Sequence, residues 1–246
     1  MSRRIRIGLI VPSSNTTMET ELPELFRRRE HRAAPGFSFH SARMRMTAVT
    51  PDALAAMDRH SDRCAVELAD ADCDVMAYAC LVAVMAAGPG AHLRVERRLS
   101  ETAGPGTPVI TSAGALAAGI RSLGVRRVAI IAPYPPPLTR KVVAYLADLG
   151  IEVVDEVSLG IADNRSVGRL DPADLIEHLG RLDVRRAQAV VLSACVQMPS
   201  LPAIPQAERL TGLPVLSAAT ATARRLLDTL GLPPGIDGGG ALLRSE

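Results

Sequence analysis

Two cysteines, Cys80 and Cys195, are the residues whose positions most strongly favour chemistry. Each follows a mostly apolar run that is typical of a buried strand, residues 74–77 before Cys80 and residues 189–192 before Cys195. Because open α/β sheets bind ligands at the carboxyl ends of parallel strands, both thiols are expected at a ligand crevice. Two thiols that face each other across such a crevice could act from both sides on one carbon skeleton.

Inert packing is the alternative for any single cysteine beside an apolar strand, because free cysteine is among the most buried residue types. Two cysteines at equivalent points of a repeat favour a functional pair instead. Cys64 and Cys73 have no counterparts in the other half of the chain, and we expect them to be structural. The spacing of the four cysteines matches no zinc site, so we predict no metal.

No histidine lies near Cys80 or Cys195 in the sequence, which makes a cysteine–histidine hydrolase an unfavoured interpretation. Backbone N–H groups and helix starts behind the strands could lower the pKa of a thiol in place of a histidine.

Three neutral polar residues near strand ends are candidates for ligand binding. Asn15 follows the strand expected at residues 6–11, Tyr134 ends the repeat of that strand, and Asn164 follows a later one. Each alone is more often a turn or loop residue, but together they offer donors for carboxylate oxygens. Arg43, the counterpart of Asn164 in the first half, could clamp a carboxylate or form a surface ion pair.

The second half of the chain repeats the signals of the first half in the same order. Ordered self-similarity of this kind indicates two copies of one set of strands and helices, although chance similarity among valine-rich strands is the alternative. The matching segments are residues 6–13 with 127–134, 50–54 with 171–175, Cys80 with Cys195, and 107–112 with 213–218.

The alternation of strands and helices predicts parallel sheets with right-handed crossovers. The predicted fold class is therefore α/β, with two similar Rossmann-like lobes related by a pseudo-twofold duplication and an active site in the cleft between them. We expect residues 1–112 plus 218–246 to form the first lobe, with Asn15 and Cys80. Residues 113–217 would form the second, with Tyr134, Asn164 and Cys195.

Three helices of the first half are predicted from their start signals and residue patterns. Residues 18–29 read as a helix with Pro23 inside it, where a proline would kink the helix or delay its start. A second helix is predicted over 50–71, with a capping threonine and a proline at its start, and a third over 91–102.

The composition excludes several function classes. The 246 residues are 48% hydrophobic but only 2% aromatic, which argues against stacking platforms for single-stranded nucleic acid. The net charge is +2 and the arginine clusters are scattered, so we predict no nucleic-acid partner. We expect no membrane span and no signal peptide, and therefore a cytoplasmic protein. We also predict no nucleotide site.

Four segments carry a resemblance to the maleate cis–trans isomerases of the aspartate/glutamate racemase superfamily. The resemblance covers nearly the whole chain and implies two α/β lobes, one catalytic cysteine from each and no cofactor. A small dicarboxylate substrate is implied, and we expect a homodimer. The segments are residues 8–17, 74–82, 132–134 and 191–200.

The resemblance also implies roles for individual residues. Cys80 would be the nucleophile that adds to an alkene carbon of maleate and forms a succinyl-cysteine. Cys195 would protonate the neighbouring carbon and later remove a proton, so that rotation and elimination give fumarate. The implied substrate-binding groups are Asn15, Tyr134 and Asn164, together with the backbone around Leu81, Val82, Val196 and Gln197.

Three alternatives remain at this point. An amino-acid or hydantoin racemase would use two cysteines, but Leu81 and Val82 are poor partners for an ammonium group. Arylmalonate decarboxylases keep only the second-lobe cysteine, whereas both are present here. A two-lobed small-molecule binding protein would share the architecture but would not need paired thiols.

Overall fold

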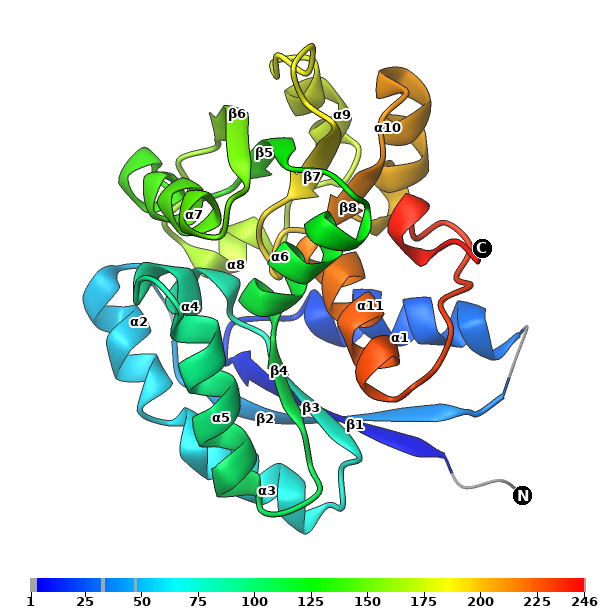
Figure 1. Cartoon of the computed structure of the whole chain (residues 1–246). Helices are drawn as coiled ribbons and strands as arrows, with labels where there is room; N and C mark the ends of the chain where they lie inside the picture. Colours follow the sequence, from blue (N-terminus) through cyan, green and yellow to red (C-terminus); the bar gives the residue numbers. More distant parts are fainter. Residues whose placement is uncertain (1–3, 32–33, 47, 246) are drawn as a thin grey trace.

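The computed structural model of the 246-residue chain describes residues 4–31, 34–46 and 48–245. In this part of the chain the long strands form two four-stranded sheets, and every strand pair is parallel (Figure 1). The first sheet has the order β2-β1-β3-β4, with β1 (Ile5–Pro12), β2 (Phe37–Met44), β3 (Val75–Tyr78) and β4 (Val109–Thr111). The second has the order β6-β5-β7-β8, with β5 (Arg127–Ala132), β6 (Glu152–Ser158), β7 (Ala189–Ser193) and β8 (Val215–Ser217).

The two sheets share one strand order, in which each strand of the first corresponds to the strand four places later in the chain. The prediction of an α/β fold with two similar parallel sheets is therefore confirmed. The central strands β3 and β7 are buried along their whole length, as expected for parallel strands with helices on both faces. This burial explains why their sequences are apolar runs without alternation.

Helices cover both faces of each sheet. Around the first sheet, α3 and α5 lie on one face, while α1 and α11 lie on the other (Figure 1). The helices of the first half are α1 (Met18–Glu30), α2 (Pro51–Asp58), α3 (Ser61–Asp70), α4 (Leu81–Ala86), α5 (Ala91–Ala103) and α6 (Ser112–Ser122). Those of the second half are α7 (Pro136–Asp148), α8 (Asn164–Val167), α9 (Asp174–Leu179), α10 (Ile204–Thr211) and α11 (Ala218–Thr229), with short 3-10 turns at Leu201–Ala203 and Ala241–Leu243.

The helix predicted over 50–71 is two helices, α2 and α3. The N–H of His60 bonds to the carbonyl of Met57 (3.0 Å), and the hydroxyl of Ser61 donates to the carbonyl of Asp58 (2.6 Å). These bonds close a tight turn that ends α2 before α3 begins. By contrast, α1 begins ahead of Pro23 and continues past it, so the proline does not delay that helix.

Helices α6 and α11 pack against each other and connect the two sheets. Their contact includes a buried hydrogen bond from the hydroxyl of Thr222 to that of Ser112 (3.0 Å). Helix α11 leaves β8 and also packs against α1, β3 and β4 of the first sheet. We propose on this basis that residues 1–112 plus 218–246 form a discontinuous first lobe, with residues 113–217 as the second.

Candidate active site

Cys80 lies two residues beyond the end of β3, at the position that begins helix α4. The strand pairing continues to this point, because the N–H of Ala79 bonds to the carbonyl of Ile10 (2.8 Å). The N–H of Ala83, in the first turn of α4, donates to the thiol of Cys80. The thiol is therefore fixed by a strand end on one side and a helix start on the other.

Cys195 lies at the equivalent end of β7, but the chain there is irregular from residue 194 to residue 200. The hydroxyl of Ser193 donates to the carbonyls of Cys195 (2.8 Å) and Met198 (3.2 Å) and holds the loop in a compact turn. The N–H of Gln197 donates to the Cys195 Sγ (3.3 Å), and Met198 N–H and the Tyr134 hydroxyl also lie within hydrogen-bond reach of the thiol.

The two cysteines meet in one buried cavity between the sheets. All nine residues singled out from the sequence line this cavity: Asn15, Cys80, Leu81, Val82, Tyr134, Asn164, Cys195, Val196 and Gln197. Pro12, Met46 and Val49 also line it and were missed. Met46 and Val49 belong to an irregular segment between β2 and α2, where no periodic pattern marks a buried side chain.

The cavity is closed and small. It leaves only about 10 Å³ of free space for the centre of a water-sized molecule, which is about the minimum that one water needs. The segment before α2 contributes to this closure, because the N–H of Val49 bonds to the carbonyl of Ala162 in the second half of the chain (3.2 Å). A dicarboxylate can enter only if part of this lining moves.

The two asparagines join segments from the two halves of the chain at the cavity. The side-chain amide of Asn15 donates to the carbonyl of Val196 (3.4 Å), and its oxygen accepts the N–H of Met18 (3.1 Å). The amide of Asn164 donates to the hydroxyl of Ser14 (2.8 Å). Both asparagines are almost fully buried, so these donors are pre-positioned and shielded from water.

The side-chain amide of Gln197 is occupied by partners within the protein. Its oxygen accepts the N–H groups of Thr16 (2.9 Å) and Thr17 (3.3 Å). Its nitrogen donates to the carbonyls of Ser14 (2.9 Å) and Asn164 (3.1 Å). Four hydrogen bonds within the protein satisfy the amide, which leaves the backbone of Gln197 as its part of the site.

Arg43 does not line the cavity. Its guanidinium donates to the carbonyls of Ser13 (2.9 Å) and Asn15 (3.0 Å) and forms an ion pair with Glu19. Of the two alternatives from the sequence, the ion pair is the one observed. Through its two carbonyl contacts, Arg43 secures the loop that carries Asn15.

Burial raises the pKa of both cavity thiols, and the backbone donors expected from the sequence act to lower it without cancelling this rise. The pKa of Cys80 is raised to about 12, chiefly by desolvation, with only Ala83 N–H opposing it. Desolvation also raises the pKa of Cys195, against three donors. Cys64 and Cys73 are buried elsewhere in the first lobe and do not line the cavity.

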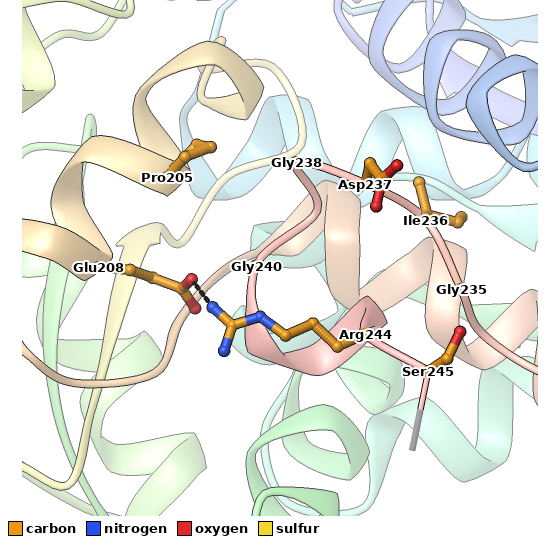
Figure 2. A pocket seen from close by; sticks show the side chains of 9 residues that line it. All are labelled: Pro205, Glu208, Gly235, Ile236, Asp237, Gly238, Gly240, Arg244 and Ser245. Carbon is orange, nitrogen blue, oxygen red and sulfur yellow. Dashed lines mark hydrogen bonds and ion pairs between the residues drawn. The ribbon is translucent and has the colours of Figure 1, made fainter.

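A larger hollow lies near the carboxyl terminus, with a volume of about 390 Å³. Figure 2 shows that Arg244 points toward Glu208 across it, and the two form an ion pair. The Glu208 carboxylate also accepts the N–H groups of Ala241 (2.7 Å) and Val215 (3.3 Å). These contacts hold the terminal segment against α10. The charged residues of this hollow therefore have structural partners within the protein.

Comparison with known proteins decides the family. The family model described as arylmalonate decarboxylase matches residues 7–243. The maleate isomerase of Geobacillus stearothermophilus is 55% identical over 100% of this chain and 100% of its own. The chain belongs to the maleate isomerase family. It is therefore an isomerase, and the binding-protein alternative is excluded.

Solved structures of the maleate isomerase family agree closely with this fold. The maleate isomerase of Pseudomonas putida S16, crystallised with maleate, is 50% identical with a TM-score of 0.97, covering 99% of this chain and 98% of that one. The Nocardia farcinica enzyme, solved as a cysteine-to-serine variant with a covalently bound succinylcysteine intermediate, is 48% identical with a TM-score of 0.95, covering 98% and 99%.

Other expectations are tested only in part. None of the described helices is long and apolar enough to cross a membrane. The described residues also contain no cluster of three or more histidine, cysteine, aspartate or glutamate side chains that could hold a metal ion. The cytoplasmic location, the homodimer and the absence of a nucleic-acid partner stay predictions.

Proposed function

We propose that this isomerase converts maleate to fumarate without a cofactor, through a covalent succinyl-cysteine on Cys80. The proposal rests on one observation above all: two thiols from equivalent strand ends line a single closed cavity together with three neutral donors. The covalent succinylcysteine in the Nocardia farcinica relative supports the same type of intermediate.

In the first step Cys80, as its thiolate, forms a bond from sulfur to one alkene carbon of maleate. The electron pair of the double bond takes the proton of the Cys195 thiol at the neighbouring carbon, which leaves Cys195 as a thiolate. The former double bond is now single, so the rotation that interconverts the two geometries becomes easy. Covalent catalysis thus replaces one difficult step by two easier ones.

In the second step Cys195 reverses its role. Its thiolate removes a proton from the carbon that was protonated, the double bond re-forms in the trans geometry, and the bond between carbon and the Cys80 sulfur breaks. Both thiols return to their starting protonation states, so no external oxidant, reductant or proton is consumed.

The remaining lining residues would hold the carboxylates and keep water out. The Tyr134 hydroxyl and the amides of Asn15 and Asn164 are neutral donors for carboxylate oxygens, as are backbone N–H groups beyond each cysteine. Met46 and Val49 contribute an apolar wall. A closed, dry cavity strengthens these polar contacts and protects the intermediate from side reactions.

The test is proton NMR of the purified protein with maleate, without added metal or nucleotide. We expect maleate signals to be replaced by fumarate signals, with no turnover in the matched Cys80→Ser protein. Absence of conversion by fully reduced wild-type protein would reject the proposal and favour a racemase. Light scattering on the same sample tests the predicted homodimer, and fractionation of producing cells tests the predicted cytoplasmic location.

A further inference from the structure

The chain segments that follow the two cysteines are not equivalent. After Cys80 the chain enters α4 at once, and the hydrogen bonds of that helix hold the segment in place. After Cys195 the chain remains irregular up to residue 200, ahead of the 3-10 turn at Leu201–Ala203. An irregular buried segment must find its hydrogen-bond partners elsewhere, because buried backbone groups are seldom left unpaired.

Glu21 of α1 supplies those partners from the other lobe. Its carboxylate accepts the N–H groups of Ser200 (2.5 Å) and Leu201 (2.6 Å) and the hydroxyl of Ser200 (3.2 Å). The residue is only 7% exposed. Three hydrogen bonds from one buried side chain thus hold this end of the loop in place.

The loop between Ser200 and the thiol is compact, so a displacement at one end would reach the other. The Ser193 hydroxyl binds the carbonyls of both Cys195 and Met198, and Gln197 N–H donates to the thiol itself. The Thr17 hydroxyl, one turn before Glu21, donates to the carbonyl of Gln197 (2.7 Å). The first turns of α1 therefore bind the loop of residues 194–200 at its middle, through Thr17, and at its end, through Glu21.

Burial of the Glu21 carboxyl group is energetically unfavourable for its charged form. Burial raises the pKa of Glu21, while the N–H groups of Leu201 and Ser200 oppose that rise without cancelling it. A buried charge is weak evidence for stabilisation of a fold, because desolvation offsets much of what its contacts contribute. A role in geometry explains the residue better than a role in stability.

We propose that Glu21 is a positioning residue, which fixes the Cys195 thiol relative to Cys80 from the opposite lobe. The inference rests on the acid/base role proposed above for Cys195. The loop carries both the thiol and the N–H groups that approach it, so loss of Glu21 would misplace the proton donor with respect to the alkene. A misplacement near 1 Å can cost on the order of a hundredfold in rate.

The experiment compares the wild-type protein with four variants. Glu21→Ala removes all three hydrogen bonds, whereas Glu21→Gln removes the charge but can preserve them, with its oxygen facing the N–H groups and its nitrogen facing the Ser200 hydroxyl. Glu21→Asp keeps the charge and withdraws it by one methylene. Glu96→Ala is the matched control, because Glu96 accepts the N–H and hydroxyl of Thr111 (both 2.9 Å) away from the cavity.

Three measurements are made on each protein: kcat and KM for maleate, the melting temperature, and the ratio of Cys195 to Cys80 alkylation by iodoacetamide, read by peptide mass spectrometry. For Glu21→Ala we expect kcat to fall about tenfold or more and the alkylation ratio to rise about threefold or more. Glu21→Gln should stay within about threefold of the wild-type kcat. Glu96→Ala should lower only the melting temperature.

Two outcomes would overturn the proposal. One is Glu21→Ala with kcat within about twofold of wild type and an unchanged alkylation ratio. The other is Glu21→Gln as impaired as Glu21→Ala, which would assign the effect to charge. If Glu21→Ala fails to fold, the same three measurements are made on Glu21→Asp. A wild-type kcat and a wild-type alkylation ratio in Glu21→Asp would then reject the positioning role of Glu21.

A Cys195→Ser protein separates this inference from the proposed function. Wild-type turnover in Cys195→Ser would reject the acid/base role itself. An inactive Cys195→Ser protein beside a fully active Glu21→Ala protein would reject only the positioning role of Glu21.

Discussion

The two thiols of the cavity have unequal surroundings. Cys195 has three donors within reach, from Tyr134, Gln197 and Met198, whereas Cys80 has the N–H of Ala83 alone and also feels the negative charges of Cys195 and Asp58. The thiol of Cys195 therefore has more hydrogen-bond donors that lower its pKa than the thiol of Cys80 has. Cys80 must lose its proton to solvent before its thiolate attacks.

This assignment predicts a pH dependence of the reaction. The pKa of the Cys80 thiol lies near 12, so its thiolate is a minor form at neutral pH and grows up to tenfold with each pH unit below that value. We expect kcat/KM for maleate to rise between about pH 6.5 and about pH 9. A pH–rate profile over this range measures it, and a flat or falling profile would contradict the role of a high-pKa thiol as nucleophile.

Cys80→Ser should lower kcat by on the order of a thousandfold or more, because a serine hydroxyl is a far weaker nucleophile than a thiolate. The substitution is nearly isosteric, so the melting temperature should stay close to that of the wild type. A fumarate assay beside a thermal melt measures both. Cys64→Ser is the control, since its buried thiol lies outside the cavity; comparable losses in the two variants would argue against a special role for Cys80.

Cys195→Ala should block turnover at a different point. The variant retains the nucleophile but lacks the base that removes the proton from carbon, so an adduct on Cys80, formed with a proton taken from water, is expected to persist. Intact-protein mass spectrometry after incubation with maleate should show a gain equal to one maleic acid molecule, located on the peptide with Cys80. Full activity in this variant would remove Cys195 from the mechanism.

The loop between β1 and α1 is the element on which several site contacts converge. It carries Asn15, it receives the amide of Gln197, and the guanidinium of Arg43 fixes two of its carbonyls. Its geometry therefore depends on groups outside the cavity. We therefore expect Arg43 to influence substrate binding without a contact to substrate.

Arg43→Ala should raise KM for maleate about three- to tenfold, because the loop loses two donors and Asn15 is no longer held in place. Steady-state kinetics measure the change. Arg27→Ala is a suitable control, since Arg27 is an exposed arginine of α1 that pairs with Glu24. Equal KM values for wild type and Arg43→Ala would mean that the loop keeps its shape without the guanidinium.

The elements that the sequence predicts best are those with a strong local pattern. The apolar strands and the repeat of their order lead directly to two parallel sheets and to five of the residues that line one cavity, whereas Leu81, Val82, Val196 and Gln197 were implied only by the resemblance to a family. Helix α4 was missed because its sequence, Leu81–Ala86, is apolar on every side and shows no helical period. Glu21 and Met46 were missed because their importance comes from contacts between distant segments, which no local pattern records.

In the molecule as a whole, direct contacts between lobes supplement the α6–α11 pairing. Besides the contacts of Glu21 and Gln197, the backbone N–H of His92 on α5 donates to the hydroxyl of Tyr145 on α7 (3.2 Å). That hydroxyl also binds the Nδ1 atom of His92. Burial lowers the pKa of His92, so the ring is neutral at pH 7 and its Nδ1 can accept the hydroxyl proton.

Tyr145→Phe should remove these two hydrogen bonds while it preserves the packing of the ring. We expect the free energy of unfolding to fall by about 1 kcal/mol. For a chain of this length the melting temperature should fall by about 3 °C. Calorimetry at pH 8, where His92 is neutral, measures the change, and an unaltered melting temperature would show that this contact contributes nothing to the union of the lobes.

The near absence of aromatic residues makes this enzyme optically simple. The sequence contains three tyrosines and no tryptophan, so its ultraviolet emission comes from tyrosine alone. Tyr78 lies two residues before one thiol, Tyr134 lies beside the other, and Tyr145 joins the lobes. We therefore expect entry of a dicarboxylate into the cavity to change the tyrosine emission of the unlabelled protein, and single substitutions to phenylalanine would assign each part of the signal to one place.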